Sequence, residues 1–187
     1  MKKLGSLTVV CGSMYAGKSE ELIRRARRAL YARKKVQVFK PAIDTRYDES
    51  MVVTHEGVTH DAVPVKSVAE LKRKFEQDTE VICVEEVQFF DDTIVDWLVS
   101  LADKGYEVIC AGLDQDFRRA PFGPMPKLLA VADEVVKLRA ICVKCGRPAS
   151  HTYRSINGKP ARKDDPVILI GATEVYEARC RACYRLR

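Results

Sequence analysis

The stretch from Leu4 to Ser19, LGSLTVVCGSMYAGKS, decides the fold of this 187-residue chain. Its first half is an apolar run without polar alternation, which is typical of a strand buried on both faces. Its second half, residues 12–19, matches the pattern GxxxxGK[ST] in full, and residues 18–33 then carry the apolar periodicity of a helix. A strand, a glycine-rich turn and a helix in this order predict a phosphate-binding loop.

The residue types of this loop predict its chemistry. Glycines allow successive backbone N–H groups to point toward one place, where they bind phosphate oxygens together with the positive end of the helix. We expect Lys18 to reach the β- and γ-phosphates of a nucleotide and the Ser19 hydroxyl to hold Mg²⁺. The expected phosphate contacts in the loop are Gly12, Ser13, Met14, Tyr15, Ala16, Gly17, Lys18 and Ser19.

The rest of the chain falls into two parts. Further strands are expected at 36–39 (ended by Pro41), 81–84 (buried), 106–111 and 135–138. Helices are expected at 67–77 (capped by Ser67) and from Asp91 or Asp92 to Gly105, and a hairpin at 51–65. This order predicts an α/β fold of the P-loop NTPase type, a mostly parallel sheet with helices on both faces, over residues 1–140. Beyond Ile141 the helical pattern disappears, and short strands at 149–156, 167–170 and 174–179 predict a second, smaller domain over residues 141–187.

Composition narrows the possible functions. With 47% hydrophobic and 31% charged residues the chain is an ordinary globular protein, and its apolar runs are too short to cross a membrane, so we expect no membrane partner and a cytoplasmic location. The net charge of +6 is compatible with a polyanionic ligand. The basic stretch from Arg24 to Lys35 is interpreted as a solvated helix face, with a nucleic-acid surface as the alternative.

Two acidic residues, Glu85 and Glu86, directly follow the expected strand 81–84. In nucleotide-binding sheets an acid at this point faces the Mg²⁺ held by the first loop, and a second carboxylate there can serve as a general base. Two glutamates that merely end a strand in solvent are the alternative. ATP is the expected nucleotide, because the base reader Asn-Lys-x-Asp of guanine-binding proteins is missing: the single asparagine, Asn157, precedes a glycine.

Seven cysteines divide into two groups. Cys11, Cys83 and Cys110 end apolar runs and are expected to be buried. Two Cys-x-x-Cys pairs with 34 residues between them suit one tetrahedral structural Zn²⁺, a redox dithiol being the alternative; the expected ligands are Cys142, Cys145, Cys180 and Cys183. Fixing both ends of the intervening segment favours a substrate lid over residues 153–176, a loop without a role being the alternative.

Several motifs occur together in the order of a known family: the loop 12–19, Asp44-Thr45-Arg46-Tyr47, Glu86-x-Gln88-Phe89-Phe90, Leu113-Asp114 with Phe117 and Pro121-Phe122-Gly123, and the two cysteine pairs. From about residue 7 to 184 the chain resembles the cytosolic-type (type II) thymidine kinases. The resemblance implies transfer of the ATP γ-phosphoryl group to the 5′-hydroxyl of thymidine, with Glu86 as general base. It also implies that Glu85 and Gln88 join the phosphate site and that Mg²⁺ lies among Ser19, Glu85 and Asp44.

The same resemblance implies a nucleoside site within a zinc-anchored lasso. Its expected residues are Met14, Phe89, Leu113, Phe117, Phe122, Thr152, Val167, Leu169, Ile170, Gly171 and Tyr176. Plain core packing is the alternative for each apolar member taken singly. The family further implies a homotetramer and dTTP as a feedback inhibitor. One departure concerns the metal site, where Glu85 replaces the usual aspartate and its added methylene must alter how Mg²⁺ is held.

Two other functions remain open at the level of sequence. A nucleic-acid-stimulated P-loop ATPase would use the zinc ribbon and the basic stretch Arg24–Lys35 as its binding surface, although we regard nucleic acid as the less favoured partner. A non-catalytic nucleotide-binding zinc module would bind ATP without consuming it.

Overall fold

The computed structural model describes residues 4–42, 51–53, 59–167 and 174–185. At its centre lies a six-stranded sheet in the order β5-β2-β6-β7-β1-β8, in which every neighbouring pair is parallel. Its strands are β1 (Ser6–Cys11), β2 (Val36–Pro41), β5 (Val63–Val65), β6 (Val81–Val84), β7 (Glu107–Gly112) and β8 (Glu134–Lys137). The predicted parallel sheet is confirmed.

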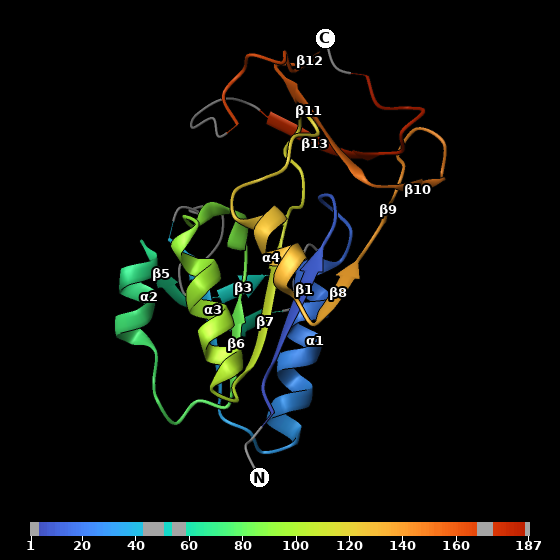
Figure 1. Cartoon of the computed structure of the whole chain (residues 1–187). Coiled ribbons are helices and arrows are strands. Elements are labelled where there is room, and N and C mark those ends of the chain that lie inside the picture. Colours follow the sequence, from blue (N-terminus) through green and yellow to red (C-terminus); the bar gives the residue numbers. More distant parts are fainter. Residues whose placement is uncertain (1–3, 43–50, 54–58, 168–173, 186–187) are drawn as a thin grey trace.

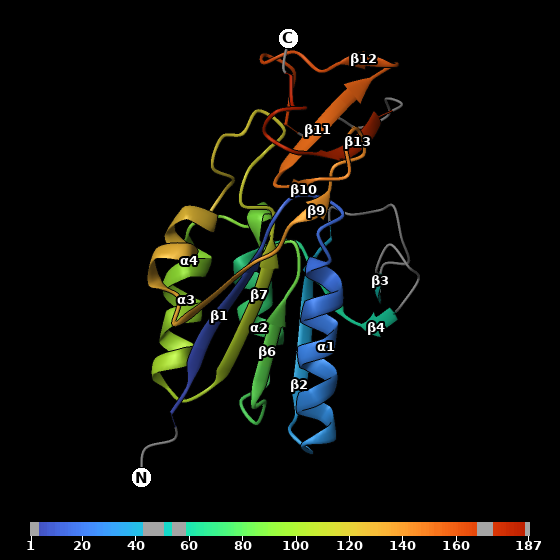
Figure 2. The same cartoon turned by 90° about the vertical axis from the view of Figure 1, so that its right-hand side faces the viewer.

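Helices cover both faces of this sheet (Figure 2). On one face α1 (Lys18–Tyr31) buries an apolar stripe against strand residues such as Val10 and Ile109. On the other face lie α2 (Val68–Lys74), α3 (Thr93–Asp103) and α4 (Met125–Val131). Because the inner strands are buried on both sides, their sequences show no polar alternation. Cys11, Cys83 and Cys110 are buried in these two cores, as expected.

Three local features differ from the sequence expectations. Strand β2 continues through Pro41, which pairs with Val65 of β5. On the other side of β2, the partner strand β6 already ends opposite Phe39, so the missing N–H of the proline interrupts no hydrogen bond to β6. Helix α4 was not predicted, because seven residues that include Pro126 carry too little periodicity. Within 51–65 the hairpin is confined to β3 (Met51–Val53) and β4 (Thr59–Asp61), whereas β5 joins the central sheet.

The helix expected over 67–77 is shorter than its pattern, but its first turn is as expected. The Ser67 hydroxyl accepts a hydrogen bond from the Glu70 amide at 3.2 Å and so caps the first turn of α2. The helix ends at Lys74, because Phe75 is extended. The aromatic ring of Phe75 packs edge-on against Trp97 and Tyr106.

The C-terminal strands lie together at one end of the central sheet (Figure 1). They are β9 (Ala140–Ile141), β10 (Pro148–Ala149), β11 (His151–Ile156), β12 (Lys159–Pro160) and β13 (Glu174–Arg179). Strand β9 pairs with β10, and β11 lies between β12 and β13; all these pairs are antiparallel. Residues 168–170 of the strand expected at 167–170 lie outside the described residues. In the described part of the chain, no helix has both the length and the apolar character that crossing a bilayer requires.

Candidate active site

The phosphate-binding loop connects β1 to α1 at the carboxyl end of the parallel sheet. It occupies residues 12–17, and α1 begins at Lys18. Gly17 caps the helix with a φ of 83°, a left-handed conformation that a glycine adopts without steric cost. The predicted order of strand, turn and helix is therefore confirmed, and the helix N-terminus faces the position where an anion would bind.

Three side chains of the expected phosphate and magnesium site lie next to one another. The Lys18 ammonium donates to the Ser13 carbonyl at 3.0 Å, which folds this lysine over the loop. The Ser19 hydroxyl donates to Glu85 Oε1 at 2.6 Å. The second oxygen of Glu85 is buried, with no hydrogen-bond partner among the described residues. A hydroxyl beside a carboxylate with a spare oxygen fits the oxygen ligands that Mg²⁺ prefers.

Burial dominates the electrostatics of Glu85. The side chain is enclosed between the phosphate loop and the end of β6, and this burial, with the neighbouring charge of Glu86, raises the pKa of its carboxyl to about 8 from the usual 4.5. The Ser19 hydroxyl and the Lys18 charge oppose the shift. Without Mg²⁺ beside it, Glu85 therefore favours the protonated form near neutral pH.

We expect Glu85→Gln to stabilise the magnesium-free protein at high pH. A raised folded-state pKa contributes stability that is fully present below pH 4.5 and is lost as the pH rises through about 8. Glutamine does not titrate, so the free energy of unfolding of the variant should exceed that of the wild type by an amount that grows over this range, on the order of a few kcal/mol. Urea denaturation at pH 5, 7 and 9, with neither Mg²⁺ nor a chelator added, measures this difference in the free energy of unfolding. Exposed Glu76→Gln is the control; equal pH dependence in both variants would contradict the assignment.

One pocket brings together most of the expected site residues. Its open volume, which includes solvent space at the mouth, is about 740 Å³. From the phosphate loop it is lined by Met14, Tyr15, Gly17, Lys18 and Ser19, and from the end of β6 by Glu86. The expected nucleoside residues that line it are Met14, Phe89, Leu113, Phe117, Phe122, Thr152, Val167 and Tyr176.

Some expected site residues are placed differently or lie outside the description. Asp44 of the expected magnesium site, and Leu169, Ile170 and Gly171 of the expected nucleoside site, lie outside the described residues. Gln88, expected at the phosphates, is buried behind Glu86 and bonds to Glu86 and to the Leu113 amide. Its amide is thus occupied by protein groups.

Sequence reasoning missed two acids of the pocket wall. Glu20, in the first turn of α1, and Asp116, after β7, both line the pocket. One oxygen of Asp116 accepts from the Arg118 and Ala120 amides at 2.8 and 2.9 Å, so this carboxylate also shapes its loop. The sequence offered one signal for Asp116, namely its position two residues after the Leu113-Asp114 pair in a turn-forming stretch. An acid in a turn does not by itself indicate a pocket.

A buried arginine, also missed, supports the segment that carries Val167. Arg154 is 1% exposed, and its guanidinium lies 4.9 Å from the centre of the Phe117 ring and 6.0 Å from that of Tyr176. It donates to the carbonyl oxygens of Pro166 and, at 3.4 Å, of Val167. The Arg154 guanidinium thus links β11 to the aromatic side chains of the pocket wall and to the backbone at Pro166 and Val167.

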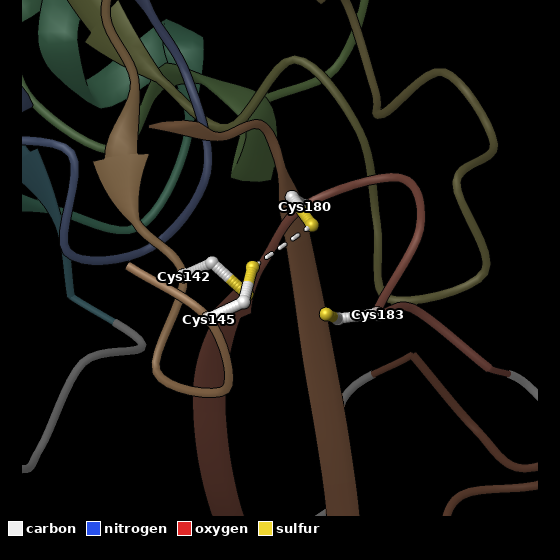
Figure 3. A group of neighbouring side chains, drawn as sticks. All are labelled: Cys142, Cys145, Cys180 and Cys183. Carbon is white, nitrogen blue, oxygen red and sulfur yellow. Dashed lines mark hydrogen bonds between the residues drawn. The ribbon is translucent and has the colours of Figure 1, made fainter. Parts of the chain in front are cut away.

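The four paired cysteines converge, although they come from two distant segments (Figure 3). Their sulfur atoms all lie within 4.8 Å of one another, and those of Cys145 and Cys180 are 3.6 Å apart. Four sulfurs bound tetrahedrally at about 2.3 Å from one zinc ion lie about 3.8 Å apart. The donor set and its spacing therefore fit a structural zinc site formed by Cys142, Cys145, Cys180 and Cys183.

This cysteine cluster packs directly against the phosphate-binding loop. Ala16 contacts the small apolar core that contains Cys142 and Cys180. Nearby, the amide of Met14 donates to the Thr152 hydroxyl of β11 at 3.1 Å. The C-terminal strands thus support both the pocket wall and the phosphate-binding loop. These contacts could not be predicted from the sequence, because the two segments lie far apart along the chain.

We expect Cys180→Ser to release the metal and to weaken binding at the expected nucleoside site. A serine hydroxyl is a poor fourth ligand in a thiolate site, so the strands that present Thr152 and Tyr176 lose their anchor. Elemental analysis should give close to one zinc per chain for the wild type and much less for the variant. Cys110→Ala, a buried cysteine outside the cluster, should retain zinc. Calorimetric titration with thymidine completes the test, and unchanged thymidine affinity in zinc-free Cys180→Ser would contradict it.

Comparison with known families agrees with this geometry. A family model described as thymidine kinase matches residues 5–184 of the 187. The match includes the phosphate-binding loop, the acids that follow β6, the pocket-lining residues after β7 and both cysteine pairs. The chain belongs to the thymidine kinase family and is therefore an ATP-dependent nucleoside kinase, a phosphotransferase.

Proposed function

We propose that the protein transfers the γ-phosphoryl group of ATP to the 5′-hydroxyl of thymidine, giving dTMP and ADP. The observation that carries this proposal is the composition of one pocket. It combines Lys18 and Ser19 of the phosphate-binding loop, the carboxylate-bearing Glu86, and an apolar aromatic wall. A phosphate site, a base and a slot for a planar ring are the parts that nucleoside phosphorylation requires.

In the proposed reaction the 5′-oxygen of the nucleoside attacks the γ-phosphorus. Glu86 accepts the hydroxyl proton, the bond from the γ-phosphorus to the bridging oxygen breaks, and ADP leaves with its electron pair. Lys18 and the loop amides stabilise the charge on the transferred group. Mg²⁺, held by Ser19 and Glu85, would neutralise charge on the β- and γ-phosphates when bound.

The aromatic wall supports recognition of a nucleobase. The rings of Phe89 and Phe122 meet edge to face, with centroids 5.5 Å apart, so the wall is fixed before a ligand enters. Met14, Leu113 and Phe117 add apolar surface, which suits the 5-methyl group of thymine. We infer that Val167 and Tyr176 close this wall from the zinc-anchored lasso.

The basic stretch Arg24–Lys35 gives little support to a nucleic-acid surface. Glu21 forms ion pairs with Arg24 and Arg25, and Arg25 also reaches Glu134, at distances of 2.6 to 2.8 Å. Lys34 pairs with Glu107 at 2.7 Å. The positive charge expected there from sequence is thus partly neutralised within the fold, which favours the nucleoside kinase over the nucleic-acid-stimulated ATPase.

Other parts of the proposal rest on family resemblance. We infer that residues 141–187 act as a distinct zinc-binding lasso unit over the nucleoside site, next to the nucleotide-binding unit of residues 1–140. We also propose a cytoplasmic homotetramer that dTTP inhibits at the substrate site. Size-exclusion chromatography with light scattering, and inhibition kinetics with dTTP, test these points.

One assay separates the candidate functions. ADP production is measured with ATP and Mg²⁺ in the presence of thymidine, deoxycytidine or single-stranded DNA, and without any acceptor. The proposal expects ADP production with thymidine, in equal amounts to dTMP, and little without acceptor. ADP production stimulated by DNA and suppressed by salt would favour the ATPase instead. ATP binding without turnover under every condition would indicate a non-catalytic module.

A further inference from the structure

We propose that Gln88 is a positioning residue that holds the carboxylate of Glu86 in its reactive direction and ties it to the pocket wall at Leu113. The inference rests on the proposed role of Glu86 as the general base. Gln88 lies two residues further along the chain, in the short 3₁₀ helix Val87–Phe89 that follows β6. It is 2% exposed and is not one of the residues that line the pocket, so it acts through its neighbours.

Both ends of the Gln88 amide have a defined partner. The Leu113 backbone N–H can only donate, so it fixes Oε1 of Gln88 as the acceptor, at 3.0 Å. The NH₂ group then faces the Glu86 carboxylate and donates to its Oε2. One oxygen of the base is thereby occupied, and Oε1 of Glu86 is the atom left to accept the 5′-hydroxyl proton.

The backbone of Glu86 explains why its side chain needs such a partner. Its φ of 49° is left-handed, a conformation that is uncommon for residues other than glycine and is often associated with functional sites. At this turn the chain leaves β6, so neither a strand ladder nor a helix fixes where the side chain points. The hydrogen bond from Gln88 restricts that direction.

Close packing keeps the Gln88 amide itself in place. A Cβ atom added at Gly112 would lie 2.6 Å from Gln88 Oε1, and one added at Gly123 would lie 2.2 Å from the Gln88 carbonyl oxygen. The end of β7 and the loop before α4 thus contact Gln88 at distances that only glycines permit. Two segments that are remote in sequence therefore determine, through Gln88, the position of one carboxylate.

The decisive variant is Gln88→Met, which is similar in length and lacks both the donor and the acceptor. We expect kcat to fall by about 10- to 100-fold, since a misplacement of about 1 Å is enough for such a loss. The dissociation constants of thymidine and ATP, measured by calorimetry, should change by less than about threefold, because Gln88 does not line the pocket. Gln115→Met, at a glutamine whose amide contacts His151 at 3.2 Å, is the matched control and should leave kcat unchanged.

A double variant separates positioning from a general structural defect. In a Glu86→Gln background there is no base to position, so adding Gln88→Met should change kcat by less than about twofold. An equal loss in both backgrounds, or a loss of affinity in place of kcat, would overturn the inference. If Gln88→Met does not fold, Gln88→Leu removes the donor and the acceptor with a shorter apolar side chain, and the same comparison applies. Full turnover in Glu86→Gln alone would instead refute the proposed base, so the two failures can be told apart.

Discussion

Replacing Glu86 with glutamine is expected to lower kcat for thymidine phosphorylation by about 10²- to 10⁴-fold, the usual contribution of a general base. Glutamine has the same shape, and its amide oxygen can still accept the hydrogen bond from Gln88. The variant therefore keeps the pocket and removes only the ability to take the 5′-hydroxyl proton. Thymidine and ATP affinities should stay within about threefold of wild type.

Single-turnover rates of dTMP formation measure this effect without interference from product release. Glu86→Asp retains a carboxylate but retracts it by one methylene, and it should fall between wild type and Glu86→Gln. The exposed carboxylate Glu76 provides a control, since Glu76→Gln should be fully active. If Glu86→Gln turns over at the wild-type rate, another group accepts the proton.

Replacing Lys18 with alanine is expected to lower the rate of phosphoryl transfer by about 10²- to 10³-fold, the loss found when one preorganised donor to developing charge is removed. The Lys18 ammonium lies inside the phosphate-binding loop, 3.0 Å from the Ser13 carbonyl. The loop amides and the helix N-terminus remain in the variant, so nucleotide binding should weaken while the fold persists.

The Lys18→Ala experiment combines a phosphoryl-transfer assay with a stability measurement. The melting temperature should remain within a few degrees of wild type, because Lys18 forms part of a binding loop and contributes little to either core. Lys104→Ala, at an exposed lysine just after α3, is the matched control and should be fully active. An active Lys18→Ala would mean that the triphosphate binds elsewhere.

Much of the fold could be predicted because its signals are local. Strand β6 is an unbroken apolar run and α1 carries a clear apolar stripe, so neither depends on knowledge of distant partners. Short elements were harder: α4 has seven residues, and the extension of β2 through Pro41 depends on where β6 ends. These features depend on contacts between segments that are distant in the chain, and the apolar periodicity of one segment does not predict such contacts.

The same division applies to the site. Sequence by itself determined the phosphate-binding loop, the parallel sheet and the four-thiol metal site, because each depends on residue types at fixed spacing along one or two short segments. The residue pattern left the roles of Glu85 and Glu86 open, and only the family resemblance divided them. The tertiary structure shows that Glu85 contacts Ser19, that Glu86 lines the pocket and that Gln88 stands behind Glu86. The physical reason is that side-chain direction at the end of a strand depends on the turn that follows and on contacts from distant segments, here the start of α1, the end of β7 and the loop before α4.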